Sequence, residues 1–181
     1  MSKKLNEVVI ISAARTPIGS YKGSLKDIKA DQLGSIVIKE VINRSKISKE
    51  DIDEVIIGQV LTAGMGQNPA RQAAINSGLS KSIPAHLVNQ VCGSGLRSVI
   101  SGYQTLMLDE GKYIICGGQE NMSLAPHSLF YRDEKILSAD KLTDTMIYDG
   151  LIDAFNNYHM GVTAENVAEK FNISRDEQDH F

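Results

Sequence analysis

Short segments rich in β-branched residues alternate with segments of helical spacing along most of this chain. Strands are predicted at residues 8–13, 53–60, 86–91 and 113–116, and helices at residues 31–42, 69–75 and 92–110. Helical crossovers are what join parallel strands, so this alternation predicts an α/β domain with a largely parallel sheet.

Composition and charge exclude several classes of protein. The 181 residues carry 19 Lys and Arg against 22 Asp and Glu, and the net charge of −3 gives no basic field for nucleic acid. Apolar runs such as residues 8–11 are far shorter than the roughly 18 residues that a membrane helix needs. Residues 1–7 are mostly polar and contain no signal peptide, so we expect a cytoplasmic chain with no nucleic-acid or membrane partner.

The later part of the chain has a different pattern. Residues 121–158 contain only short apolar patches, which predicts a long excursion from the core with little regular structure. Helical spacing returns at residues 163–171, and a capping box at residues 174–177 begins another helix. We therefore expect a core at residues 1–120, an excursion at 121–160 and returning helices at 161–181. The last helix has no closing cap or polar tail, which indicates an interrupted chain.

The segment that is most typical of a catalytic site is Asn89-Gln90-Val91-Cys92-Gly93-Ser94-Gly95, where a predicted strand turns directly into a predicted helix. Backbone N–H groups and the partial positive charge at a helix amino end favour a thiolate, so Cys92 is a candidate nucleophile. Free cysteine is also commonly a small buried residue, and the pattern alone leaves both interpretations open. The helix that follows has an apolar stripe and a stripe of small residues, which predicts burial on most sides.

Other candidate sites are weak. Cys116 follows a hydrophobic run and has no charged neighbour, so it is interpreted as a structural residue. The histidines and cysteines do not have metal-ligand spacing, and no metal is expected. Gly64-Met65-Gly66 does not complete a dinucleotide fingerprint.

Six short segments, in order along essentially the whole chain, resemble the thiolase family and within it the biosynthetic acetyl-CoA acetyltransferases. They are residues 15–19 (RTPIG), 64–73 (GMGQNPARQA), 88–96 (VNQVCGSGL), 117–123 (GGQENMS), 149–155 (DGLIDAF) and 158–166 (YHMGVTAEN).

The resemblance implies a fold, a site and a set of partners. The fold is a thiolase-like amino-terminal half, with a mostly parallel five-stranded sheet, helices on both faces and an irregular loop domain. Cys92 takes the acyl group and its backbone N–H contributes to an oxyanion hole, whereas Leu151, His159 and Met160 bind substrate. Without the resemblance, His159 is interpreted as a satisfied loop histidine. Acetyl-CoA, acetoacetyl-CoA and CoA are the expected substrates and products, no cofactor is expected, and the family implies a homotetramer.

The resemblance also exposes an absence. A complete thiolase carries, in a second half, a histidine in a G-H-P context, a cysteine in a C-x-G-G-G context and an asparagine in an N-E-A-F context, and this sequence contains none of them. The alternative is therefore a catalytically incompetent fragment, or a subunit that needs a complementary chain. Another condensing enzyme, such as a ketoacyl synthase, is a further alternative, against which residues 67–72 and 159–161 argue.

Overall fold

The computed structural model describes residues 7–129 and 142–181. The chain divides into two compact units, one ending at Pro126 and the other running from His127 to Phe181. The three-part division expected from the sequence, with boundaries near residues 120 and 160, stays a prediction. Each unit is described by itself below.

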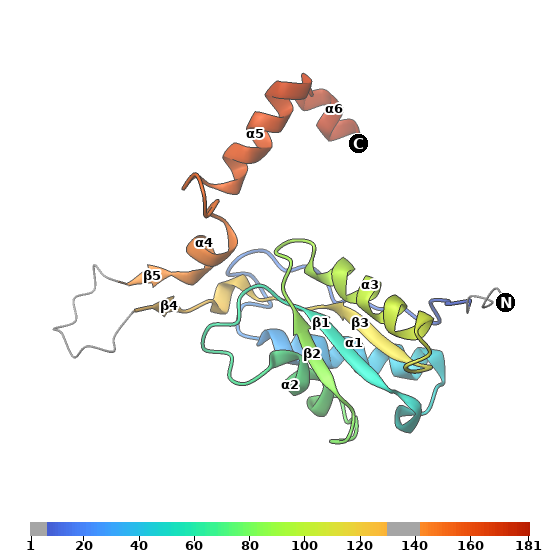
Figure 1. The fold of residues 1–181 in the computed structure, drawn as a ribbon. Coiled ribbons are helices and arrows are strands. Elements are labelled where there is room, and N and C mark those ends of the chain that lie inside the picture. Colours follow the sequence, from blue (N-terminus) through green and yellow to red (C-terminus); the bar gives the residue numbers. More distant parts are fainter. Residues whose placement is uncertain (1–6, 130–141) are drawn as a thin grey trace. The chain divides into compact units, whose positions relative to one another are not determined.

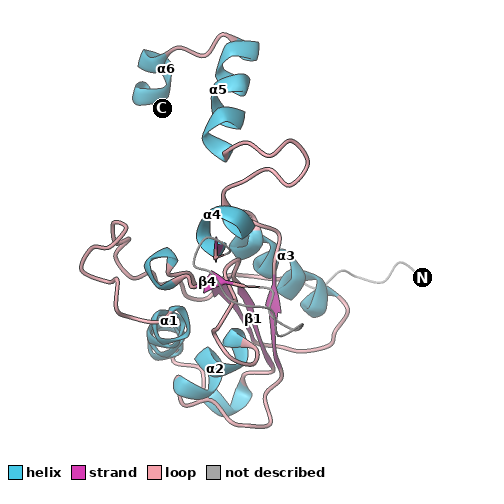
Figure 2. Cartoon of the chain, turned by 90° about the vertical axis from the view of Figure 1, so that its left-hand side faces the viewer, coloured by secondary structure: helices cyan, strands magenta, loops and turns pink. Residues whose placement is uncertain are grey.

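The first unit is built on a parallel sheet of three strands, β1 (Glu54–Gly58), β2 (Ala85–Val88) and β3 (Ile114–Gly118), in the order β2-β1-β3 (Figure 1). Figure 2 shows α1 (Ala30–Ser45) and α2 (Pro69–Asn76) on one side of this sheet and α3 (Ser94–Met107) on the other. A short 3₁₀ turn, η1 (Lys49–Asp51), precedes β1, and another, η2 (Met122–Leu124), follows β3. The predicted α/β fold with a parallel sheet and helices on both faces is confirmed.

The apolar core lies between the sheet and the α1–α2 layer. Val55 and Ile57 of β1 are fully or almost fully buried there, together with Ile38 of α1 and the alanines of α2. Ile56 alternates to the opposite face and is also buried. A strand that is apolar on both faces is typical of a parallel sheet covered by helices on both sides, which is why the pattern of β1 could be read from the sequence.

Two sequence predictions about the sheet are wrong for the described residues. Residues 8–13 form no strand, and the parallel sheet has three strands instead of five. A cavity of about 470 Å³, lined by residues 8–16, α1, α3 and β3, adjoins this segment, and Ile10 is 82% exposed. A β-branched sequence becomes a strand only when a neighbouring edge supplies ladder hydrogen bonds, and here the cavity lies where such a neighbour would pair.

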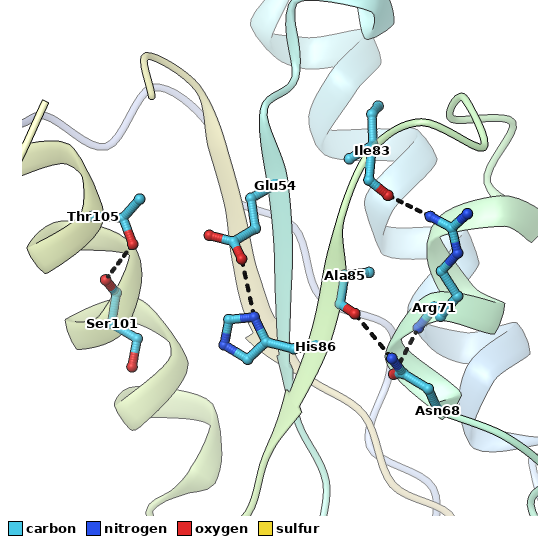
Figure 3. A network of polar contacts seen from close by, with 8 residues as sticks. All are labelled: Glu54, Asn68, Arg71, Ile83, Ala85, His86, Ser101 and Thr105. Atoms are coloured by element: carbon cyan, nitrogen blue, oxygen red, sulfur yellow. Dashed lines mark hydrogen bonds and ion pairs between the residues drawn. The ribbon is translucent and has the colours of Figure 1, made fainter. Parts of the chain in front are cut away.

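Polar side chains at the start of α2 fix the beginning of β2 (Figure 3). Asn68 caps α2 by accepting a hydrogen bond from the Arg71 N–H, and its Nδ2 donates to the Ala85 carbonyl at 2.9 Å. The Arg71 guanidinium donates to the carbonyls of Ile83 and Lys81. The polar residues of the 64–73 segment therefore hold the strand that leads to Cys92.

The loop formed by residues 20–28 is attached to the chain that leaves β3. Asn121 Nδ2 lies within hydrogen-bonding distance of three carbonyl oxygens, those of Leu25 (3.2 Å), Lys26 (3.1 Å) and Ile28 (2.7 Å). Ser123 Oγ accepts a hydrogen bond of 2.8 Å from the Lys22 N–H. Two segments about a hundred residues apart in the sequence are thus joined.

The second unit contains short elements. They are the antiparallel pair β4 (His127–Ser128) and β5 (Thr143–Asp144), and the helices α4 (Thr145–Gly150), α5 (Met160–Phe171) and α6 (Arg175–His180). The predicted helix at 163–171 and the capping box at Ser174 and Glu177 are confirmed. Part of the predicted excursion, residues 130–141, lies outside the described residues. Among the helices described in both units, none has the length and apolar character needed to cross a membrane.

Candidate active site

Cys92 lies in a tight turn that joins β2 to α3. The strand ends at Val88, the helix begins at Ser94, and Gly93 is the N-cap residue, so the cysteine directly precedes the helix amino terminus. Its side chain is exposed. The predicted strand-to-helix placement is confirmed, and the alternative of a buried structural cysteine is wrong.

The residue before Cys92 has a strained backbone. Val91 has φ of +49°, in the left-handed region that L-residues avoid, and it is β-branched. This conformation costs about 1–2 kcal/mol and persists only where the surrounding structure enforces it. Cys92, the next residue, is exposed. The sequence did not indicate the positive φ of Val91 because no glycine marks the position.

Asn89 and Ser94 supply the contacts that hold this conformation. The Val91 N–H donates to Asn89 Oδ1 at 2.9 Å, and the other contacts come from Ser94. Its Oγ accepts a hydrogen bond from the Gln90 N–H at 2.8 Å and donates one to the Val91 carbonyl at 2.6 Å. The N–H groups of Gly93 and Ser94 also bond within the turn, to the carbonyls of Gln90 and Val91 at 3.1 and 3.0 Å. Each such bond contributes about 0.5–1.5 kcal/mol, so the two hydroxyl bonds together match the cost of the strained residue.

Glycines on two strands let the helix start sit close to the sheet. A Cβ at Gly58, the last residue of β1, would lie 2.4 Å from the Ser94 carbonyl carbon. A Cβ at Gly118, the last residue of β3, would lie 3.4 Å from the Gly95 Cα. Glycine is therefore required at position 58, whereas a Cβ at position 118 would make an ordinary contact, and the helix start lies against the carboxyl ends of β1 and β3.

A buried polar cluster occupies the same end of the sheet. Gln119 Nε2 donates to Gln59 Oε1 at 2.8 Å, and Glu120 Oε2 accepts hydrogen bonds from the N–H groups of Val60 and Leu61. Burial raises the pKa of Glu120 above its usual range, and the backbone hydrogen bonds partly oppose this rise. The cluster fixes how the chain leaves β1 and β3.

Cys116 lies inside β3 and has the character of a core residue. It is half-buried, and a Cβ at Gly102 of α3 would be 2.3 Å from its Sγ. Burial raises the pKa of this thiol from 9.0 to about 11. The interpretation of Cys116 as structural is supported, because a thiol of this kind is protonated at neutral pH.

The two stripes predicted on α3 behave differently. Of the predicted small-residue stripe of Gly95, Ser98 and Gly102, Ser98 and Gly102 are buried and Gly95 is partly buried. The Ser98 hydroxyl donates to the Gly117 carbonyl of β3 at 2.8 Å. The apolar stripe is largely exposed, with Leu96 at 69%, although Val99, Tyr103 and Leu106 also line the cavity beside residues 8–16. The prediction that this helix is buried on most sides is therefore wrong for the described chain, because only the small residues let the sheet backbone approach closely.

In the second unit, residues 151–160 form a small hairpin. The Met160 N–H donates to the Leu151 carbonyl at 2.8 Å, and Ile152 forms an antiparallel bridge with His159. The three predicted substrate-binding residues, Leu151, His159 and Met160, are thereby brought together at the open end of one hairpin loop, where Met160 is already the first residue of α5. Their role in binding stays a prediction.

His159 has a structural function that sequence reasoning missed. It is the N-cap of α5, and its Nδ1 accepts a hydrogen bond of 2.9 Å from the Gly161 N–H. A neutral ring that accepts at Nδ1 carries its proton on Nε2, so an N–H donor remains on the exposed side of the ring. The interpretation as a satisfied loop histidine fits this geometry, and the remaining donor leaves room for the substrate role.

The turn of this hairpin is organised by Asp153. Its carboxylate accepts hydrogen bonds from Asn156 Nδ2 at 2.6 Å and from the Phe155 N–H at 3.0 Å. These bonds, the Asn156 amide first, lower the pKa of Asp153 below its usual range. Phe155 is 95% exposed at the tip, so the loop presents an aromatic ring on its surface.

The site residues fall in both units, with Cys92 in the first and Leu151, His159 and Met160 in the second. Within residues 7–129 and 142–181, no group of three His, Cys, Asp or Glu side chains is arranged to hold a metal ion.

Comparisons with known proteins agree over nearly the whole chain. The family described as Thiolase, N-terminal domain, matches residues 8–181. An acetyl-CoA acetyltransferase of Paracoccus denitrificans is 52% identical over 177 residues, and one of Cupriavidus necator is 52% identical over 178 residues; each match covers 98% of this chain and 45% of that protein. A cytosolic acetyl-CoA acetyltransferase of Rattus norvegicus is 48% identical over 179 residues, 99% of this chain and 45% of that protein. The chain thus spans somewhat less than half the length of these relatives.

Proposed function

The chain belongs to the thiolase family, and we propose that it is the amino-terminal half of an acetyl-CoA C-acetyltransferase with Cys92 as the acyl acceptor. The observation that carries this proposal is the β2–Cys92–α3 turn, which holds an exposed thiol at a helix amino terminus. The whole enzyme would condense two acetyl-CoA molecules to acetoacetyl-CoA and CoA, or run the reverse cleavage.

The first half-reaction transfers an acetyl group from one sulfur to another. The Cys92 thiolate attacks the carbonyl carbon of acetyl-CoA, a new C–S bond forms to Cys92, and the C–S bond to CoA breaks. CoA leaves as a thiolate and takes up the proton that Cys92 released. Thioester exchange of this kind needs a nucleophile and an oxyanion donor but no resident cofactor.

We assign the oxyanion donor to the Cys92 N–H. The N–H groups of Gly93 and Ser94 are already used inside the turn, by the carbonyls of Gln90 and Val91. Donors that are fixed before the reaction stabilise developing negative charge without reorganisation, and the bonded turn supplies this rigidity.

The hairpin of residues 151–160 is proposed to bind the CoA thioester. Leu151 and Met160 supply apolar surface from the two ends of this hairpin, and the Nε2–H of His159 supplies a donor toward an amide or carbonyl oxygen of the substrate. The hydrogen bond from Gly161 to Nδ1 fixes the ring in the tautomer that this contact needs.

The second half-reaction needs groups that this sequence does not contain. A base must remove an α-proton from the second acetyl-CoA before the carbanion attacks acyl-Cys92 and the C–S bond to Cys92 breaks. The G-H-P, C-x-G-G-G and N-E-A-F contexts expected for this step are absent from the sequence. We therefore propose that complete turnover requires a carboxy-terminal half. By analogy with the cytosolic rat relative, we propose a cytoplasmic enzyme. We also propose a homo-oligomer, which is what the resemblance to the family implies.

The direct test is the intact mass of the purified chain after incubation with acetyl-CoA, together with an acetoacetyl-CoA thiolysis assay. We expect an adduct of one acetyl group that is lost in Cys92→Ala and kept in Cys116→Ala, without thiolysis. Thiolysis by the isolated chain would refute the claim that a second half is indispensable. A wild-type chain that folds and takes up no acetyl group would refute the role of Cys92.

A second candidate function is a subunit that has no activity until a complementary chain covers it. The exposed apolar stripe of α3 and the apolar cavity beside residues 8–16 favour this alternative. Binding of a hydrophobic dye by the purified chain, abolished by a co-expressed carboxy-terminal half, would support it. Dye binding that is absent, or that persists in the presence of that half, would count against it.

A further inference from the structure

We propose that Ser94 is a positioning residue for acylation, acting through the conformation of Val91 to place the Cys92 thiol. This inference rests on the proposed function of Cys92. Ser94 is only 3% exposed, and its hydroxyl lies on the inner side of the turn, so it acts through the backbone that carries the cysteine.

The hydroxyl spans the strained position. It accepts a hydrogen bond from the Gln90 N–H, one residue before Val91, and donates to the Val91 carbonyl, so one oxygen joins the residue before the strained position to the peptide after it. The Val91 N–H itself donates to Asn89 Oδ1. Cys92 is the next residue along the chain. If Val91 returns to a negative φ, the peptide that follows it rotates, and the Cys92 side chain and N–H change direction with it.

Water cannot readily replace this hydroxyl. Gly58 of β1 packs against the Ser94 backbone so closely that a Cβ there would be 2.4 Å from its carbonyl carbon. The Val91 carbonyl would keep its bond from the Ser94 N–H, whereas the Gln90 N–H would lose its acceptor. Removing the hydroxyl therefore leaves a donor unpaired and favours relaxation of the turn.

Ser98 is a matched control one turn further along α3. It is also a buried serine, and its hydroxyl oxygen lies 2.7 and 2.8 Å from the carbonyl oxygens of Gly95 and Gly117, which share its single proton. Ser98→Ala thus removes the same chemical group from the same helix and the same packed face, but its bonds do not involve residues 90–92.

The experiment measures the rate at which acetyl-CoA acetylates Cys92 in the purified chain, by intact mass. The same variants are treated with iodoacetamide, which reports on the thiol without any acyl transfer. Ser94→Ala is expected to slow both reactions about tenfold, the effect of one lost hydrogen bond of ordinary strength. Ser98→Ala is expected to change them by less than about twofold, although both variants lower the melting temperature.

A rescue variant separates positioning from general loss of structure. Glycine adopts φ of +49° without steric cost, so adding Val91→Gly to Ser94→Ala should recover most of the lost rate. Equal rates for Ser94→Ala and Ser98→Ala would overturn the proposal, and so would a slow Ser94→Ala chain that Val91→Gly does not improve. Labelling at Cys116 shows whether a variant has unfolded. If Ser94→Ala has unfolded, the acetylation rate of the double variant Val91→Gly/Ser94→Ala tests the proposal instead.

The acyl-acceptor role of Cys92 and the positioning role of Ser94 can be refuted separately. If the wild-type chain takes up no acetyl group, the proposed function fails, and the iodoacetamide rates still decide whether Ser94 positions the thiol. If acetylation occurs and is insensitive to Ser94, the proposed function stands and this inference is refuted.

Discussion

Cys92 and Cys116 are each preceded by a β-branched residue and followed by glycine, and each lies in or just after a strand of the same sheet. They differ in how far their side chains are exposed to solvent. Cys92 lies beyond the end of a strand, exposed, before a helix. Cys116 lies inside a strand beneath Gly102, where burial raises its pKa to about 11. The comparison teaches that position along the strand decides the chemistry of a thiol, since the neighbouring residue types are the same.

The largest expected difference is in alkylation. With a pKa of about 11, only about one part in a thousand of Cys116 is thiolate at pH 8. Peptide mass analysis after iodoacetamide treatment should therefore find Cys92 modified at least a hundredfold faster than Cys116 at that pH. Labelling of Cys116 should rise about tenfold per pH unit up to about 11. Comparable alkylation rates of Cys92 and Cys116 at pH 8 in a folded chain would contradict this difference between the two thiols.

The next largest effect concerns the packing above Cys116. In Gly102→Ala the new Cβ would lie 2.3 Å from the Cys116 Sγ, so overpacking should cost about 2–3 kcal/mol of unfolding free energy. Gly117→Ala is the matched control, because a Cβ there meets no atom within 4 Å and should cost under about 1 kcal/mol. Denaturant unfolding measures both.

A double variant sharpens this test. Combining Gly102→Ala with Cys116→Ala removes the sulfur that the new methyl group meets, and should recover about half of the lost stability or more. The recovery is incomplete because Ile114 Cγ2 would still lie 3.1 Å from the same Cβ. Additive costs in the double variant would mean that the contact between α3 and the thiol is not the source of the strain.

The smallest effect is the pH dependence of stability at alkaline pH. The folded chain keeps the Cys116 proton up to about pH 11, whereas the unfolded chain releases it near 9.0, so stability is full below pH 9 and falls toward pH 11. Because the side chain is only partly buried, the loss relative to Cys116→Ala should be about 1 kcal/mol. Parallel urea titrations of the two chains at pH 8 and 10.5 measure this difference, and an identical pH dependence would contradict it.

Secondary-structure elements could be predicted from the sequence where a short segment itself contains the pattern that is typical of the element. The buried run of β1, proline at the start of α2 and the capping box of α6 are of this kind. Residues 8–13 have the composition of a strand, but pairing depends on an edge elsewhere in the molecule, which no local pattern reveals. The burial of the apolar stripe of α3 could not be predicted for the same reason, because it depends on which distant residues pack against this helix.

The sequence was sufficient to predict the central residue of the candidate site, Cys92, but not the contacts that hold its turn. Glycines around Cys92 and the change from strand to helical spacing indicated the turn. The positive φ of Val91 and the two bonds of Ser94 carry no such mark, since valine rarely adopts this conformation and serine is common at helix starts. For His159 the signal was its place just before a helical segment, which identifies an N-cap.

The attachment of the 20–28 loop by Asn121 and Ser123 has a consequence for how the first unit opens. The Lys22 N–H donates to a serine hydroxyl about a hundred residues away, so we expect its exchange with solvent to be slowed while the chain leaving β3 stays attached. The loop of residues 20–28 and the chain that leaves β3 then open as one cooperative unit, so the surface loop gains protection from hydrogen exchange through its attachment to the sheet. Asn121→Ala should therefore accelerate deuterium uptake in a segment that the substituted residue does not adjoin in sequence.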